Sequence, residues 1–374
     1  MPVVVHSSLQ FNTFNKIVSE EYLLKKINGE LENPHVDFNY DIYESESLKN
    51  DFIQDMKDFY DEQYSYDSNV KLTFQLDVYK FFLLNSIVVK FYKPDTNEII
   101  GYIVGKKIKL IIDKKIVNTM EVSFFCIHKK FRNKHYTPYF INVILREFIN
   151  RYNISISTYA LSDNIKSPYY TIKHNIHRPI NISHLKRCDF LPADYDCTRF
   201  TLFERNDNVD LVYLNNTDVP SSLIDVLHKK LHLFQSKNFT VFKALSKKDL
   251  DSMFKNKNFH NFIIFNKDKT IKDFISFYDL QINVINKNLK YDSSSIYSMY
   301  FSEYDTKNIR STLELISEYC CKYNIIDVLS FFDVFPVSDY SDIKCVVGQG
   351  SLHYYMFNYN MIPIPNDKIS YVTI

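Results

Sequence analysis

The chain has 374 residues, of which 45% are hydrophobic and 16% aromatic, so it can build a large buried core and is not a disordered protein. Lys and Arg number 45 against 44 Asp and Glu, and a formal net charge of +1 argues against nucleic-acid binding through overall charge. No segment is apolar over the length of a membrane span, and the N-terminus lacks the charged and apolar regions of a signal peptide.

The length favours two structural units or one large fused unit. Each half of the chain predicts the succession strand, turn, strand, strand, helix, strand. Residues 99–104 are strand-like, and residues 121–127 alternate between polar and apolar types, which is typical of strands. Residues 138–150 carry apolar side chains at helical spacing, and Thr137 is expected to be the N-cap of this helix. Residues 153–156 are expected to form the strand that follows.

The second half repeats this succession at an offset of 171 residues. Arg151–Ile154 falls on Lys322–Ile325, and the predicted helix falls on residues 309–321. A closing strand is expected at residues 325–329. An internal duplication of one α/β unit explains the match, and chance similarity between two α/β units of biased composition is the alternative.

A basic loop leads into the helix of the first half. Residues 129–137 read KKFRNKHYT, and a helix N-terminus offers free N–H groups that favour anions, so this loop is a candidate phosphate site. At the same offset the second half has the acidic Glu303–Thr306. Polyanion binding is therefore expected of the first half and not of the second. The structural alternative is a solvated basic turn.

Several ordered motifs resemble those of the N-myristoyltransferase family. Residues 121–134, EVSFFCIHKKFRNK, resemble its signature E-I-N-F-L-C-V-H-K-K-L-R-S-K-R, and residues 348–359 resemble G-x-G-x-L-x-Y-Y-x-Y-N-W. Residues 273–278 are similar to D-F-L-S-F-Y, residues 177–181 to H-R-S-L-N, and residues 64–74 to N-Y-V-E-D…F-R-F. The resemblance runs collinearly from about residue 55 to residue 374, which is far more specific than one pattern. The divergence from the family pattern, and a composition rich in Asn, Ile, Lys and Tyr that is typical of an AT-rich genome, suggest a viral or otherwise fast-evolving source.

The resemblance implies an α/β fold of two fused acetyltransferase-like (GNAT-type) halves with pseudo-two-fold symmetry. We expect residues 1–205 to form the half that binds acyl-CoA and residues 206–374 to form the half that binds the peptide. The implied reaction transfers myristate from myristoyl-CoA to the N-terminal glycine amine of proteins. Myristoyl-CoA is then a substrate, no cofactor is bound permanently, and the partners are peptides with an N-terminal glycine. We expect a monomer that acts in the cytoplasm without nucleic acid.

The resemblance also implies the catalytic groups. Attack on the thioester produces an oxyanion, and in the family two backbone amides at a strand bulge, here those of Phe124 and Phe125, donate hydrogen bonds to it. An N-terminal amine has a pKa near 8 and needs a base. The family uses the carboxylate that ends its chain, which corresponds here to Ile374.

The binding residues follow from the same alignment. The residues implied for acyl-CoA are Gln10, Phe11, Asn12, Phe124, Phe125, Cys126, Ile127, Arg132, Asn133, Lys134, His135, Tyr136 and Thr137. The residues implied for the peptide are Tyr64, Asp67, Phe74, Tyr159, His177, Gln349 and Leu352.

Departures from the family pattern keep other functions open. Ser123 replaces an Asn, Tyr159 a Thr and Gln349 an Asp, and the acidic run that reads a basic peptide residue is reduced to Asp67. We therefore expect less demand for lysine in the peptide. One alternative is a catalytically weak or silent relative that binds acyl-CoA or acylated partners. The other is an acetyltransferase-like enzyme with a different acyl donor.

Cysteine and histidine spacing gives no metal motif. The six cysteines are scattered without CxxC, which indicates reduced thiols of a cytoplasmic protein. His228 and His232 have the i, i+4 spacing of two ligands on one helix face, but a helical surface patch is the favoured interpretation.

Overall fold

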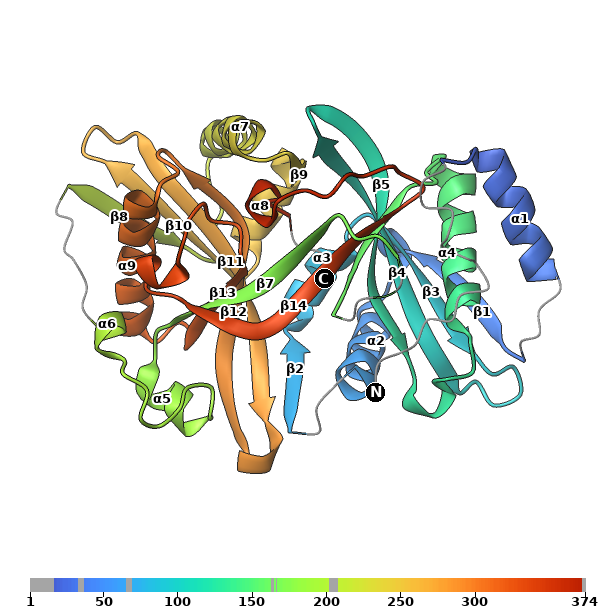
Figure 1. Ribbon diagram of the computed structural model, residues 1–374. Coiled ribbons are helices and arrows are strands. Elements are labelled where there is room, and N and C mark those ends of the chain that lie inside the picture. Colours follow the sequence, from blue (N-terminus) through green and yellow to red (C-terminus); the bar gives the residue numbers. More distant parts are fainter. Residues whose placement is uncertain are drawn as a thin grey trace.

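The computed structural model describes residues 17–32, 37–64, 69–162, 165, 167–201 and 208–371. Fourteen strands of these ranges form one sheet that runs through the whole molecule, and helices pack on it (Figure 1). The strands are β1 (Asn39–Glu44), β2 (Val70–Phe74), β3 (Ser86–Tyr92), β4 (Ile99–Ile112), β5 (Lys115–Ile127), β6 (Ser157–Leu161), β7 (Thr171–Pro179), β8 (Val209–Leu214), β9 (Val241–Lys243), β10 (Phe259–Asn266), β11 (Ile271–Val284), β12 (Leu289–Phe301), β13 (Val328–Phe332) and β14 (Val346–Phe357). The helices are α1 (Glu20–Glu32), α2 (Asn50–Gln63), α3 (Leu76–Leu83), α4 (Thr137–Tyr152), α5 (Ile182–Arg187), α6 (Thr198–Thr201), α7 (Ser221–Asn238), α8 (Lys247–Lys255) and α9 (Thr306–Tyr323).

The predicted duplication is confirmed element by element. Moving β6 by 171 residues places it on β13, residues 328–332, and α2 and α3 fall in the same way on α7 and α8. Strands β1, β3, β4 and β5 correspond to β8, β10, β11 and β12, and α4 corresponds to α9. Chance similarity cannot place so many elements in one order at one offset, so the chain holds two copies of one α/β unit.

The strand order shows how the two copies are joined. The order is β1-β3-β4-β5-β6-β14-β7-β13-β12-β11-β10-β8. Strands at equal distances from the two ends of this order correspond to each other, from β1 and β8 at the ends to β14 and β7 in the middle. Strand β14 therefore lies beside β6, and β7 lies beside β13. In Figure 1 these two strands cross the middle of the molecule between the halves. The predicted pseudo-two-fold symmetry is confirmed, with the axis between β7 and β14.

Each half also contributes one short strand that pairs with a strand of the other half. Strand β2 of the first half pairs with β11, and β9 of the second half pairs with β4. The largest hydrophobic core accordingly contains residues of both halves, among them Phe124 on β5, Phe277 on β11 and Leu313 on α9. Burial of apolar surface thus stabilises the two halves together.

Two local predictions are wrong by a few residues. Helix α4 begins at Thr137 and its N-cap is Tyr136, so Thr137 is already helical. The strands expected from residues 153 and 325 begin later, at Ser157 and Val328. The reason is that Asn153 and Asn324 have φ of 54° and 50° and end their helices in the left-handed conformation, which Asn tolerates better than most residues.

Two further predictions concern membrane-spanning segments and the state of the cysteines. No helix in the described ranges is long and apolar enough to cross a membrane. The six cysteines all lie in these ranges and are free thiols, as predicted.

Candidate active site

A β-bulge interrupts the pairing of β4 with β5 at the residues expected to form the oxyanion hole. Tyr102 pairs with Cys126 and Val104 pairs with Ser123, so Phe124 and Phe125 both stand opposite Ile103. Phe124 has φ of 44°, a left-handed conformation that is rare for a bulky side chain. A bulge releases main-chain groups from the ladder, and backbone strain of this kind gathers at functional sites.

An aromatic cluster from three elements packs around the bulge. The ring of Phe124 is buried, with its centroid 4.3 Å from Tyr79 on α3, 5.3 Å from Tyr60 on α2 and 5.6 Å from Phe74 on β2. Tyr64 stacks on Tyr60 at 4.4 Å. Two residues predicted to bind the peptide, Tyr64 and Phe74, therefore belong to the surroundings of the bulge.

Tyr79 is a residue that the sequence did not single out. Its hydroxyl is buried and has no hydrogen-bond partner among the described residues. Burial raises the pKa of Tyr79 well above its ordinary value, so the hydroxyl keeps its proton. Such an unpaired group beside a strained strand is a feature of functional sites. In the sequence Tyr79 is one of several apolar residues of a helix and resembles an ordinary core residue.

In the basic loop after β5, some side chains are exposed to solvent and others form hydrogen bonds within the protein. Lys134 and His135 are exposed, while the guanidinium of Arg132 donates hydrogen bonds to the carbonyl oxygens of Ile127, at 3.0 Å, and Gln63. Asn133 and His135 have φ of 65° and 56° and turn the chain toward α4. The loop thus presents Lys134 next to the N-terminus of α4, whereas Arg132 stabilises the conformation of the loop by its bonds to main-chain oxygens.

The remaining residues expected at acyl-CoA lie on either side of this loop. Cys126 is buried, which raises its pKa to about 11, and Ile127 ends β5. Tyr136 and Thr137 are buried at the start of α4, and the Tyr136 hydroxyl donates to Asp37 Oδ1 at 3.0 Å.

A cluster of three hydroxyl groups lies at the junction of the halves. Thr158 Oγ1 on β6 lies 2.8 Å from the Tyr371 hydroxyl and 3.4 Å from the Tyr170 hydroxyl, and the two tyrosines also contact each other. All three residues are buried. Because Thr158 pairs with Glu121 on β5, three residues before Phe124, it lies roughly 10 Å along the strand from the bulge. The C-terminal segment therefore approaches the bulge from the second half.

Two of the predicted peptide-binding residues line one open pocket of about 480 Å³. They are His177 on β7 and Gln349 on β14, and the other walls come from β2, the β11–β12 hairpin and the segment after α5. Burial lowers the pKa of His177 to about 4, so the ring is neutral near pH 7, and its Nδ1 lies 2.8 Å from Ser330 Oγ. The carboxylate of Asp189 in the lining is paired with Lys287 at 2.5 Å.

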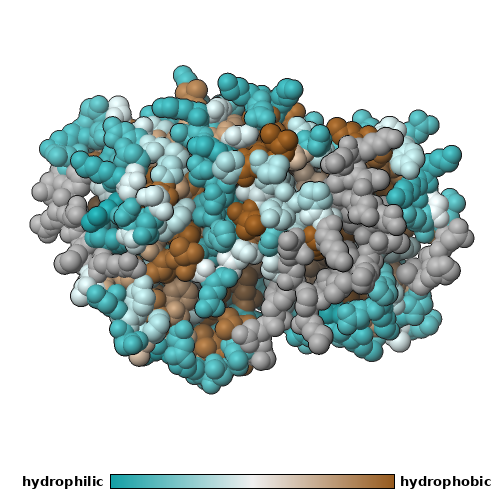
Figure 2. Space-filling model, viewed as in Figure 1, coloured by the Kyte–Doolittle hydropathy of each residue, from teal (hydrophilic) through white to brown (hydrophobic). Residues whose placement is uncertain are grey.

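The rim of this pocket is apolar. Val70, Ile285 and Val347 are exposed around it, although they are large hydrophobic side chains. Figure 2 shows hydrophobic groups at the surface in the lower left of the view, near the start of β14 and between α5 and the β11–β12 hairpin. The described lining is thus suited to uncharged rather than basic side chains.

Gly348, the first residue of the motif at residues 348–359, lies at the edge of the pocket. Val347 pairs with Ile176 and Ser351 with His174, so residues 348–350 bulge out opposite the single residue Asn175. A Cβ at Gly348 would lie 2.5 Å from His177 Nε2. Glycine is therefore needed here because the main chain passes directly over the histidine ring.

Two other predicted peptide-binding residues lie near the hydroxyl cluster, and the remaining predicted site residues lie outside the described residues. Tyr159 on β6 stacks on Tyr355 at 5.3 Å, and its buried hydroxyl has no hydrogen-bond partner among the described residues. Leu352 packs in the cluster that contains Tyr170 and Tyr371. Gln10, Phe11, Asn12, Asp67 and Ile374 lie outside the described residues.

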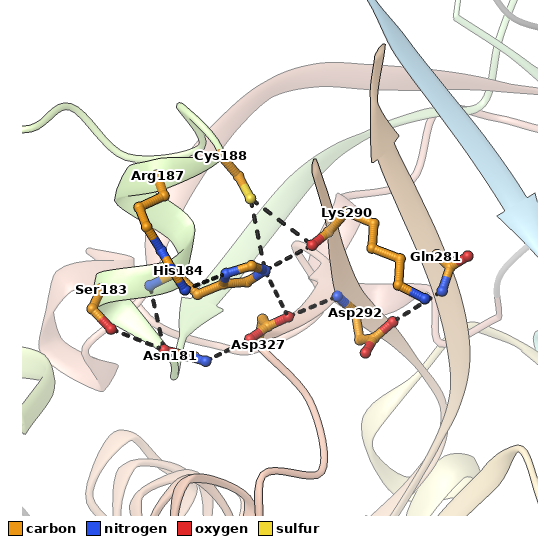
Figure 3. A network of polar contacts seen from close by, with 9 residues as sticks. All are labelled: Asn181, Ser183, His184, Arg187, Cys188, Gln281, Lys290, Asp292 and Asp327. Carbon is orange, nitrogen blue, oxygen red and sulfur yellow. Dashed lines mark hydrogen bonds and ion pairs between the residues drawn. The ribbon is translucent and has the colours of Figure 1, made fainter. Parts of the chain in front are cut away.

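Cys188, His184 and Asp327 form a group that resembles a catalytic triad (Figure 3). Cys188 Sγ lies 3.8 Å from His184 Nε2, which lies 3.9 Å from Asp327 Oδ2. However, Nε2 lies 2.7 Å from the Lys290 carbonyl, which can only accept a hydrogen bond, and Nδ1 receives one from Arg187 at 3.0 Å. The proton is therefore on Nε2, so His184 cannot take the proton of the thiol. This group ties α5 to β12 and β13 and is structural.

His228 and His232 both have partners within the protein. Nε2 of His228 bonds to the carbonyl oxygen of Leu245 at 3.0 Å, and Nδ1 of His232 lies 3.5 Å from Ser236 Oγ. Among the described residues, no cluster of His, Cys, Asp and Glu has the geometry of a metal site.

Comparison with known proteins gives a consistent result over most of the chain. Residues 19–171 match the family described as "Myristoyl-CoA:protein N-myristoyltransferase, N-terminal domain", and residues 193–371 match its "C-terminal domain". The glycylpeptide N-tetradecanoyltransferase of Plasmodium falciparum is 30% identical over 291 residues, which are 75% of this chain and 68% of that protein. The protein of the same name from Kluyveromyces lactis is 27% identical over 297 residues, 72% of this chain and 64% of the relative. These relatives give no support to a viral source.

Solved structures share the fold. Crystal structures of Saccharomyces cerevisiae N-myristoyltransferase with bound myristoyl-CoA match with a TM-score of 0.78 at 20% identity, over 96% of this chain and 89% of theirs. A second such structure matches with a TM-score of 0.73 over 89% and 86% of the two chains. The predicted α/β fold of two acetyltransferase-like halves is confirmed.

Proposed function

Because the chain belongs to the N-myristoyltransferase family, we propose that it transfers myristate from myristoyl-CoA to the N-terminal glycine amine of proteins and peptides. The observation that carries this proposal is the bulge at Phe124 and Phe125, with its left-handed residue and the aromatic cluster around it. The relatives named above are transferases of this kind, and a structural neighbour binds myristoyl-CoA.

The thioester carbonyl is assigned to the bulge. The glycine amine attacks the carbonyl carbon, and the carbonyl oxygen becomes an oxyanion in the tetrahedral intermediate. The amides of Phe124 and Phe125 donate hydrogen bonds to this oxyanion, and the intermediate collapses with release of the CoA thiolate. Because these donors belong to the main chain, Phe125 can replace the leucine of the family.

The phosphates of CoA are assigned to the loop at residues 132–137 and the first turn of α4. Lys134 and the free N–H groups of the helix supply positive charge. Arg132 holds the loop through its contacts with Ile127 and Gln63. At the corresponding end of α9, the carboxylate of Asp305 accepts a hydrogen bond from the N–H of Asn308 at 2.9 Å, which disfavours an anion there. The first half alone therefore binds the polyanion.

The base is assigned to the carboxylate of Ile374. The glycine amine is mostly protonated at pH 7, so a group near the bulge must take its proton. The burial of Ile369 and Tyr371 at the junction of the halves, with Tyr371 on Thr158, supports this assignment. One additional residue after Ile374 should abolish transfer, and undiminished turnover of the extended protein would refute this role.

The peptide is assigned to the pocket with His177 and Gln349. Its described lining mixes apolar side chains with uncharged polar ones, its histidine is neutral, and its one carboxylate is paired with Lys287. A peptide with an apolar residue downstream of the glycine should therefore be acylated at least as well as one with lysine there. A panel of peptides that differ at these positions, compared by kcat/KM, tests this expectation, and a strong preference for lysine contradicts it.

Acyl transfer to a glycine peptide decides between the three functions. The protein is incubated with radiolabelled myristoyl-CoA or acetyl-CoA, a peptide with N-terminal glycine, and the same peptide with N-terminal alanine as control. Myristate on the glycine peptide alone supports the proposal. Acetyl transfer indicates the acetyltransferase-like alternative, and binding of myristoyl-CoA without transfer indicates a silent relative. A monomer acting in the cytoplasm stays a prediction.

A further inference from the structure

Lys173 is a buried amine that the proposed reaction does not use. It lies on β7, directly beside the pseudo-two-fold axis, and the residue is 1% exposed. A lysine is rarely buried to this degree unless its amine has specific partners, because transfer of the charge from water is costly. The partners of Lys173 therefore show what the residue does.

These partners are main-chain oxygens, two of them from the C-terminal segment. Lys173 Nζ donates hydrogen bonds to the carbonyl of Ile369 at 2.7 Å and to the carbonyl of Asn366. The carbonyl of Asp333, after β13, lies at 3.4 Å. One side chain of the central sheet thus contacts the C-terminal segment at two points, three residues apart.

The C-terminal segment depends on individual contacts of this kind. Between residues 358 and 371 it forms no strand and only the short 3₁₀ turn at Asn366–Lys368. Its other attachments are one isolated parallel bridge between Ile369 and Val241, with the Ser370 N–H on the Val241 carbonyl at 3.0 Å and the Thr240 N–H on the Lys368 carbonyl at 2.8 Å, and the apolar packing of Ile369 and Tyr371. Loss of one anchor is therefore not compensated by a helix or a sheet ladder.

A small cavity adjoins the same contact. It measures about 30 Å³ and is lined by Lys173, Ser298, Ser370 and Tyr371, among others. The hydroxyls of Ser298 and Ser370 are buried and have no hydrogen-bond partner among the described residues. A cavity of this size accommodates a water molecule that bonds to these hydroxyls, so polar contacts add to the apolar packing of Ile369 and Tyr371 in holding the segment.

We propose that Lys173 is a positioning residue that fixes the C-terminal segment 366–371 at the junction of the halves, and that acyl transfer depends on this position. The dependence on transfer rests on the proposed function. The link is Tyr371, whose hydroxyl contacts Thr158 on the strand next to the bulged strand. The segment fixed by Lys173 is thus the one that reaches toward the reacting groups.

Amide hydrogen exchange tests whether Lys173 fixes the C-terminal segment, and this measurement does not depend on enzymatic activity. Lys173→Met keeps the apolar stem and removes the donor, which leaves buried carbonyls unpaired. Exchange at the amides of Ser370 and Thr240 should accelerate about tenfold or more. Lys106→Met is the matched control, because Lys106 is also buried but its Nζ contacts the Phe81 carbonyl in the first half. It should leave these two amides unchanged.

Lys173→Gln provides a second variant with an amide donor at the same place, and it should restore part of the protection. Unchanged exchange at residues 366–371 in Lys173→Met overturns the proposal. Loss of protection throughout the molecule in both variants at Lys173 also overturns it, because Lys173 would then support the whole fold.

Single-turnover transfer tests the functional part. Lys173→Met should bind myristoyl-CoA within twofold of the unmodified protein and transfer myristate to a glycine peptide about tenfold more slowly or worse. Faster exchange with unchanged transfer overturns the dependence of the reaction on Lys173. If the unmodified protein transfers no myristate, the proposed function fails, while the exchange experiment still decides whether Lys173 fixes the segment.

Discussion

Phe124 belongs to the hydrophobic core and to the candidate site at the same time. Its ring is buried among Tyr60, Phe74 and Tyr79, while its backbone adopts φ of 44° and breaks the pairing of β5 with β4. The aromatic contacts stabilise a conformation that is unfavourable by about 1–3 kcal/mol for such a residue. The sequence motif identified the position of the bulge, but the residues that hold it come from α2, β2 and α3.

The bulge amide of Phe125 can be tested by substitution. Phe125→Pro removes the N–H, and loss of one oxyanion donor should lower kcat about 100- to 1,000-fold. Phe125→Leu is the control, because it keeps the amide and an apolar side chain against Phe140. Single-turnover rates with bound myristoyl-CoA measure the effect, and equal rates for the two variants would exclude this amide from the reaction.

Lys173 also predicts how stability depends on pH. Burial lowers the pKa of Lys173 from 10.5 to about 7, so between about pH 7 and 10 the unfolded chain binds the proton that the folded chain has released. The free energy of unfolding should therefore rise with pH in this window. Burial lowers the pKa of Lys106 to about 7 as well, with an effect of the same sign.

Urea unfolding at pH 7, 8 and 9 measures this dependence. In Lys173→Met the rise in stability between pH 7 and 9 should be smaller than in the unmodified protein. A slope that stays the same in Lys173→Met and in Lys106→Met would show that neither amine is responsible.

At the scale of elements, local patterns predicted which segments form strands and helices but not how distant segments pair. Alternation in residues 121–127 and helical spacing in residues 138–150 predicted β5 and α4. The pairing of β2 with β11 and of β9 with β4 joins segments that are far apart in the chain. Periodicity along the chain carries no information about such partners. The contacts of Arg132 with the Gln63 carbonyl and of Lys173 with the Ile369 carbonyl also join segments that are distant in the chain, so these roles could not be predicted either.

The bulge between β7 and β14 gives a prediction at this scale. Gly348→Ala would place a Cβ 2.5 Å from His177 Nε2, and His177 is held by Ser330, so the strand or the ring must shift. The KM for the peptide should rise several-fold while the affinity for myristoyl-CoA stays the same.

Gly29→Ala is the matched control for this substitution. Gly29 lies in α1, where a Cβ would meet nothing within 4 Å, so alanine should stabilise the helix by about 0.5–1 kcal/mol and leave the KM unchanged. An unchanged KM in Gly348→Ala as well would separate the pocket at His177 from peptide binding.

For the whole molecule, the proposed function assigns different tasks to the two copies of the duplicated unit, which share one framework. Both halves retain a bulge in corresponding strands, at Phe124 and Phe125 in β5 and at Tyr297 in β12. The helix that follows begins after a basic loop in the first half and at the acidic Asp305 in the second. The charges at these two helix N-termini favour an anion at α4 and disfavour one at α9, which is the basis for proposing a single acyl-CoA site in the first half.

Strand exchange predicts that neither half folds alone. A fragment of residues 1–205 would lack β14, which pairs with β6 and β7, β13, which pairs with β7, and β9, which pairs with β4. It would also expose the part of the shared core that the second half covers. Unpaired strand edges and exposed apolar surface both oppose folding, and the fragment 206–374 loses the corresponding partners.

Each fragment should therefore show a poorly dispersed NMR spectrum and unfold without a cooperative transition. Co-expression should restore a dispersed spectrum and one transition, because all strand pairs can form again between the two pieces. The intact chain is the reference. A fragment that alone unfolds cooperatively would show that its half is stable without the exchanged strands, and the central pair β7–β14 would then join two independent domains rather than complete one fold.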